Sequence, residues 1–141
     1  MSRTKRHFDK IMDLIGDLDV NWDGEGAEPI SEEVMQMTKD VFLALMDAWN
    51  GNMEIPSIMP LANGSIDLYW ATRISKEELW RDDNLKSQLL LNISYVNGDH
   101  RISCNGAMDV RDKSADTISF IGDHEQFLSY DLASLQRFQN D

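Results

Sequence analysis

The chain has 141 residues, with 25 acidic and 13 basic side chains and a formal net charge of −12 at pH 7. This length predicts one domain over residues 1–141, large enough to bury a hydrophobic core without disulfides or metals. A surface this negative repels phosphate backbones and anionic lipids, so we expect neither direct nucleic-acid binding nor membrane binding. A basic protein would instead be attracted. The alternative is that the charge serves solubility alone.

Cys104 is the single cysteine, which excludes an internal disulfide framework and a cysteine-based zinc site. A lone cysteine fits a reducing compartment. No stretch approaches the roughly 20 consecutive apolar residues that span a bilayer, and the basic N-terminus lacks the apolar run of a signal peptide. We therefore expect a cytoplasmic protein of a bacterium, an archaeon or a virus that infects one.

Two helices are expected first. Residues 4–18 place apolar side chains on one stripe at helical spacing. A second helix is expected over residues 31–50, with Ser31 as its N-cap and two glutamates in its first turn, where the helix dipole favours them. Gly51 is a suitable stop. Together they predict an antiparallel helical hairpin over about residues 4–50.

The apolar period then changes to about 2, which predicts strands. We expect them at residues 56–60, 66–70, 87–96, 101–104 and 117–121, with residues 73–86 forming a short helix or a loop between two of them. Leucines at helical spacing predict a last helix over about residues 124–138. The expected class is α+β: two antiparallel N-terminal helices packed on a four- or five-stranded antiparallel meander over about residues 56–121, plus a C-terminal helix.

Two motifs resemble a family of small uncharacterised prokaryotic proteins. The first is W-D-G-E-G-A at residues 22–27, followed by P-I-S at residues 29–31. The second is P-S-I-M-P at residues 56–60, followed by Gly64 and I-D-L-Y-W at residues 66–70. The resemblance covers about the first half of the chain. It implies a fold more than an activity, because no activity is established for these proteins.

The connection at residues 19–31 allows two interpretations. Asp19, Asn21, Asp23 and Glu25 match the opening of an EF-hand calcium loop. The match fails at its twelfth position, where Ile30 replaces the bidentate glutamate. The alternative, which we favour, is a structured turn. In it Asp23 accepts hydrogen bonds from the following amides, the two glycines take positive φ, and Trp22 packs between the helices.

Negative charge gathers around the same connection. Residues 11–38 contain no lysine or arginine, and an uncompensated cluster costs folding stability through self-repulsion. Such a cost often accompanies a use, here docking to a basic groove or imitating a row of phosphates. The alternative is a solvated face without a partner. The expected partner-binding residues are Asp13, Asp17, Asp19, Asp23, Glu25, Glu28, Glu32 and Glu33.

Signals for catalysis are weak. His7, His100 and His124 are far apart in the sequence and match no nucleophile or zinc motif. Cys104 lies in a strand pattern, which favours a core thiol over a nucleophile. We expect no cofactor. Trp80, in the polar segment 73–86, is either an exposed interface anchor or a side chain that packs back on the sheet.

These patterns predict a non-catalytic, acidic protein-binding module. Its expected partner is a basic protein that handles nucleic acid. Immunity proteins, antitoxins and phage-encoded inhibitors of host defence, anti-CRISPR proteins among them, share this profile of small size, acidity and lack of catalytic motifs, which is an analogy of composition. Two alternatives stay open: a calcium-binding module that uses Asp19, Asn21 and Asp23, and a housekeeping protein or enzyme with an unrecognised site. The sequence predicts no oligomeric state.

Overall fold

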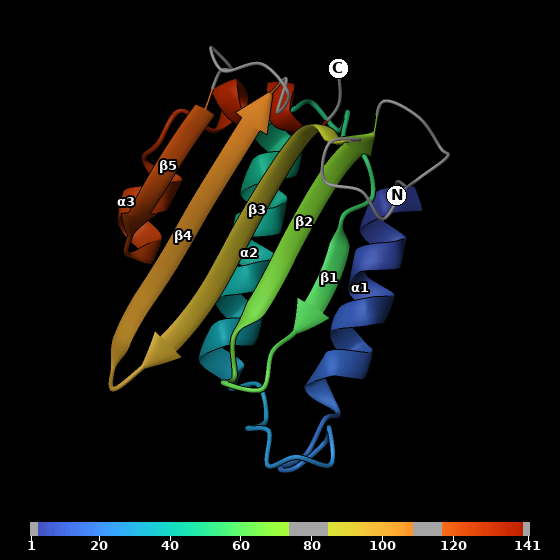
Figure 1. Ribbon diagram of the computed structural model, residues 1–141, viewed down its shortest axis with the longest axis vertical. Coiled ribbons are helices and arrows are strands. Elements are labelled where there is room, and N and C mark those ends of the chain that lie inside the picture. The colour runs from blue at the N-terminus through green and yellow to red at the C-terminus, as the bar shows by residue number, and fades with distance from the viewer. Residues whose placement is uncertain (1–2, 74–84, 109–116, 140–141) are drawn as a thin grey trace.

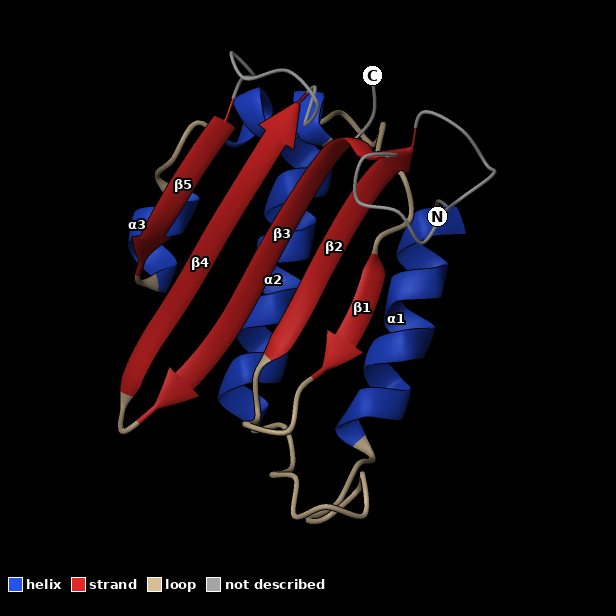
Figure 2. Ribbon diagram, in the orientation of Figure 1, coloured by secondary structure: helices blue, strands red, loops and turns tan. Residues whose placement is uncertain are grey.

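The computed structural model describes residues 3–73, 85–108 and 117–139, which form two layers (Figure 1). A five-stranded antiparallel sheet has the strand order β1-β2-β3-β4-β5, and the helices lie on one of its faces (Figure 2). The predicted α+β class and antiparallel meander are therefore confirmed. In chain order the elements are α1 (Arg3–Gly16), α2 (Glu32–Ala48), β1 (Ser57–Pro60), β2 (Ile66–Arg73), β3 (Leu85–Val96), β4 (Asp99–Met108), β5 (Thr117–Gly122), α3 (His124–Leu128) and the 3₁₀ helix η2 (Leu132–Phe138).

The strands form because their side chains alternate between a buried and a more exposed face, as expected for a sheet covered on one side. Ile66, Leu68 and Trp70 of β2 are buried against the helices, while Asp67 and Tyr69 between them face the other way. The same alternation buries Leu89, Leu91 and Ile93 of β3. The β3–β4 hairpin turns at Asn97 and Gly98, both at positive φ (54° and 79°), as a tight two-residue turn requires.

The helices dock through aromatic side chains. Phe8 of α1 stacks on Phe42 of α2, with ring centroids 3.7 Å apart, and both rings are buried. The Ser31 hydroxyl caps α2 by accepting a hydrogen bond from the Val34 amide at 3.2 Å, as predicted. Because α1 and α2 are antiparallel, the end of α1 and the start of α2 lie at the same end of the domain (Figure 1).

The C-terminal helix is shorter than the expected span of residues 124–138. A capping box between Asp123 and Gln126 starts α3, which ends at Leu128, and a separate 3₁₀ helix follows. The reason lies in the spacing of its buried side chains: Leu132, Leu135 and Phe138 are three residues apart, which matches the 3₁₀ repeat. Sequence periodicity alone did not separate this repeat from that of an α-helix.

None of the described helices is both long and apolar enough to cross a membrane. Trp80 and most of the segment 73–86 lie outside the described residues.

Candidate protein-binding surface

The loop between α1 and α2 is a structured turn, as we favoured. Asn21, Gly24 and Gly26 take positive φ values of 62°, 77° and 85°, so the backbone bends sharply over residues 21–26. The Asn21 amide donates to the Ala27 carbonyl at 2.7 Å, and the Gly26 amide donates to the Asn21 side-chain oxygen. These bonds close the loop across its base and fix its backbone.

Asp23 organises the turn from within. Its Oδ1 accepts hydrogen bonds from the amides of Glu25 at 2.8 Å and Ala27 at 3.1 Å. Ala27 is buried, and the adjacent Glu28 amide donates to the Ala62 carbonyl at 2.8 Å, which ties the loop to the β1–β2 turn. The loop is thus held both by its own side chains and by the sheet.

Trp22 differs from the expectation that it packs between the helices. It is only partly buried and does not belong to the hydrophobic core. Its indole N–H instead donates to the Glu28 carbonyl at 2.7 Å, across the loop itself. The side chain therefore braces the loop, and Phe8 and Phe42 fill the contact between the helices.

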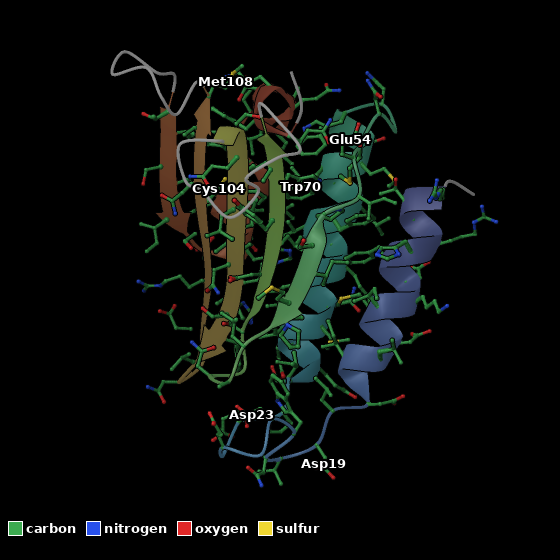
Figure 3. All side chains as sticks on the ribbon, turned by 45° about the vertical axis from the view of Figure 1, so that its right-hand side comes forward. Asp19, Asp23, Glu54, Trp70, Cys104 and Met108 are labelled. Carbon is green, nitrogen blue, oxygen red and sulfur yellow. The ribbon has the colours of Figure 1, made fainter. Side chains whose placement is uncertain are left out.

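All eight predicted acidic side chains are exposed, and the antiparallel helices bring them to one end of the domain. Figure 3 shows Asp19 and Asp23 on the loop at this end. Within the described residues, none of the eight lies in an ion pair with a lysine, arginine or histidine. We call this set the acidic surface: Asp13 and Asp17 of α1 and the segment that follows it, Asp19, Asp23, Glu25 and Glu28 of the loop, and Glu32 and Glu33 of α2.

A shallow hollow of about 540 Å³ lies on the outer side of α2 and is lined by Glu32, Glu33, Met35, Gln36 and Lys39. A Cβ atom placed on Gly16 would lie 3.4 Å from the Met35 methyl group, so the end of α1 lies close beside this hollow. Two residues of the acidic surface, Glu32 and Glu33, thus line the hollow together with the apolar Met35 and the basic Lys39.

The geometry does not favour calcium at Asp19, Asn21, Asp23 and Glu25. The Asp19 Oδ1 accepts from the neighbouring Val20 amide at 2.8 Å, and the Asn21 and Asp23 oxygens accept from other loop amides. In the part of the chain that the structure describes, no group of three or more His, Cys, Asp or Glu side chains is placed to hold a metal ion.

Cys104 is a core thiol, as predicted. Its side chain is buried on β4, and burial raises the pKa of the thiol from 9.0 to about 12. It is therefore protonated and enclosed at neutral pH, which are poor conditions for a nucleophile. His7 and His100 are exposed.

His124 takes part in a contact that the sequence did not reveal. Its Nε2 lies 3.7 Å from a carboxylate oxygen of Asp40, which joins α3 to α2. The two residues are 84 positions apart, and no motif links them, so only the tertiary structure brings them together.

No family model, curated protein or solved structure matches this chain. The resemblance carried by residues 22–31 and 56–70 therefore stays a prediction.

Proposed function

We propose that this domain is a non-catalytic protein-binding module of the inhibitor type, which docks its acidic surface on a basic protein partner. The observation that carries the proposal is the state of the eight carboxylates: all are exposed, and none is neutralised by a cation among the described residues. Like charges gathered at one end repel one another and lower the stability of the fold. A positively charged partner would relieve that repulsion.

The loop geometry supports binding because it fixes where part of the charge lies. The hydrogen bonds of Asn21, Asp23 and Trp22 hold the backbone in one conformation before any partner arrives. A surface ordered in advance loses less conformational entropy on association than a flexible acidic tail would. The long-range attraction also raises the association rate, and the effect is greatest at low salt.

The chemistry of the partner follows from that of the surface. A row of exposed carboxylates resembles the phosphates of a nucleic acid in charge, so a groove that binds a phosphate backbone would accept it. We therefore propose a nucleic-acid-handling protein as the partner and the cytoplasm as the place of the encounter. Immunity proteins, antitoxins and phage-encoded inhibitors of host defence share this profile of small size and acidity, and the comparison with them rests on composition and charge.

The proposal is tested with two quadruple variants that carry the same change in net charge. The first replaces acids of the acidic surface that accept no hydrogen bond within the described residues: Asp17→Asn, Glu25→Gln, Glu28→Gln and Glu33→Gln. The control replaces exposed acids elsewhere: Asp47→Asn, Glu54→Gln, Glu125→Gln and Asp131→Asn.

The partner is first captured on the tagged wild-type chain from an extract of the native organism, and its affinity for all three proteins is then measured by calorimetry. We expect the first variant to lose at least about tenfold in affinity and most of the salt dependence, while the control stays close to wild type. Equal affinities for the two variants would show that the acidic surface is not the interface.

A further inference from the structure

The two edges of the sheet differ in how they are protected. Edge strands expose unpaired N–H and C=O groups, and proteins usually protect them with charges, proline, short length or a covering element. β1 is only four residues long, ends at Pro60 and lies beside α1 (Figure 1). β5 has six residues, Thr-Ile-Ser-Phe-Ile-Gly, with neither a charged residue nor a proline, and the short helix α3 packs beside it (Figure 1).

The outer side of β5 has open hydrogen-bonding groups. In an antiparallel pair, every second residue turns its N–H and C=O away from its neighbour. β5 pairs only with β4 among the described strands, in the register Ala107↔Thr117 to Ile102↔Gly122. No hydrogen bond within the described residues reaches the backbone of Thr117–Gly122 from its outer side. Ile121 on this strand is 66% exposed, the highest value among the large apolar side chains of the described residues.

We infer that β5 is a second interaction site, which accepts an extended, positively charged segment of a partner as a sixth strand of the sheet. The hydrogen-bonding pattern requires an extended backbone, since a helix satisfies its own amides and carbonyls. The site is separate from the acidic surface and does not depend on it. β5 lies at one side edge of the sheet, whereas the loop between α1 and α2 lies at one end of the domain (Figure 1).

Charge decides between a second copy of this chain and a different partner. Two copies would bring together two molecules that each carry −12, and a net charge of this size opposes self-association. A segment with lysine or arginine meets no such barrier. The high negative charge thus opposes pairing of this edge, which carries no charge or proline of its own, with a second copy, while it leaves the edge available to a strand of opposite charge.

The end of β5 offers a place for a basic side chain. A hollow of about 240 Å³ lies between Ile121, Gly122 and Asp123 on one side and residues 99–101 on the other. Two carboxylates line this hollow, those of Asp99 and Asp123. Arg101 pairs with Asp99 at 2.9 Å, whereas the exposed Asp123 has no ion pair within the described residues. Asp123 uses Oδ1 to cap α3 and keeps its second oxygen for another donor.

The side chains of β5 also predict a pattern in the added strand. Ile118 and Phe120 pack against the hydrophobic core, whereas Thr117, Ser119 and Ile121 face away from the helices. Residues of an added strand that lie beside Ile118 and Phe120 would extend the core, so apolar residues are expected at alternate positions.

The test uses the full chain and two synthetic peptides. One peptide alternates threonine and valine between flanking lysines, and the other has glutamates in place of the lysines. NMR spectra with each peptide report the chemical shifts and the hydrogen exchange of the backbone amides. We expect the lysine peptide to shift the amides of Thr117–Gly122 and slow the exchange of those that point outward, and to bind at least about tenfold more tightly than the glutamate peptide.

Two variants with the same charge change locate the site. Ile121→Lys places a cation on β5, and Met59→Lys does so on β1, at the opposite edge; both side chains are more than half exposed, so the fold should tolerate both. Only Ile121→Lys should abolish the shifts on β5. Shifts confined to other strands, or equal binding of the two peptides, would overturn the inference. A dimer in analytical ultracentrifugation that Ile121→Lys dissociates would also overturn it, because the occupant would then be a second copy.

Discussion

The indole rings of Trp49 and Trp70 meet edge to face in the core, with centroids 5.5 Å apart and planes inclined by 69°. Each indole N–H donates to a backbone carbonyl at 2.8 Å: Trp49 to Leu132 and Trp70 to Glu54. This pair joins the end of α2 to the sheet and, through its hydrogen bonds, to η2 and to the segment that precedes β1. It is therefore one of the contacts that link the helical layer to the sheet.

Replacing either tryptophan by phenylalanine should destabilise the domain, and Trp49→Phe should cost more. Trp49 and Leu132 are both buried, so the substitution leaves a buried carbonyl unpaired as well as a cavity, for about 3 kcal/mol in total. The backbone carbonyl that accepts from Trp70 belongs to Glu54, which is exposed. Water can therefore reach this carbonyl more easily after Trp70→Phe. Chemical denaturation followed by circular dichroism measures both; an equal loss for the two variants would contradict this reasoning.

Asp23 should be needed for its oxygen more than for its charge. Asp23→Ala removes the acceptor of two loop amides and should destabilise the domain by about 1–2 kcal/mol. Asp23→Asn keeps a side-chain oxygen at the same place and should cost clearly less. Thermal unfolding of both variants tests this, and a similar drop in melting temperature for the two would mean that the carboxylate charge is the important property.

Gly106→Ala should destabilise the sheet. A Cβ atom at this position on β4 would lie 2.9 Å from both the Ile118 side chain and the Phe138 ring, which is too close for packed carbon atoms. Overpacking of this kind costs about 1–3 kcal/mol.

Gly16→Ala is the matched control for Gly106→Ala. A Cβ atom there meets only the flexible end of Met35 at 3.4 Å, and alanine suits the helix better than glycine. Urea unfolding should therefore show a loss for Gly106→Ala and no loss for Gly16→Ala. Equal stability of the two variants would show that Phe138 moves aside without cost.

Cys104 should make stability fall in alkaline solution. Burial raises the pKa of its thiol to about 12 in the folded protein, compared with 9.0 ordinarily. The thiol therefore contributes no pH dependence below pH 9. Above that value the unfolded chain loses the proton first, so each further pH unit up to 12 lowers the free energy of unfolding by about 1.4 kcal/mol.

The comparison protein for this effect is Cys104→Ala, which lacks the thiol. Between pH 9 and pH 10 the free energy of unfolding should fall more steeply with pH in wild type than in Cys104→Ala. Rapid reaction of the native thiol with a disulfide reagent at neutral pH would contradict the enclosed position of Cys104.

The sequence predicted the elements well where local chemistry decides them. Ser31 and the following glutamates mark the start of α2, and Asn97-Gly98 marks the β3–β4 turn. The alternation of β2 and β3 gave the buried face of the sheet. The sequence was less informative at the C-terminus. There the three-residue spacing of Leu132, Leu135 and Phe138 suits an α-helix and a 3₁₀ helix, and only packing against β3 and β4 selects the 3₁₀ helix.

For the candidate site, the sequence predicted a cluster of acidic side chains without nearby lysine or arginine. It also predicted a turn in which Asp23 accepts hydrogen bonds from the following amides. It could not predict the role of Trp22, because a tryptophan beside two helices fits a core position as well as a loop brace. The prolines of residues 56–60 and the uncharged residues 117–121 are visible in the sequence, and a meander places these two strands at its edges. The sequence could not show that the outer side of β5 stays unpaired among the described residues, because this is a property of the assembled sheet.

The strand order of the sheet has a consequence for how the polypeptide acquires its structure. Each strand pairs with the next one along the chain, so hairpins can form one after another with little loss of loop entropy, which favours fast folding. The two long helices, however, leave the ribosome before the strands that bury their apolar stripes. The two helices can bury Phe8 against Phe42 on their own, but apolar side chains that need the sheet must stay exposed to water, or be shielded by a chaperone, until the strands have been synthesised.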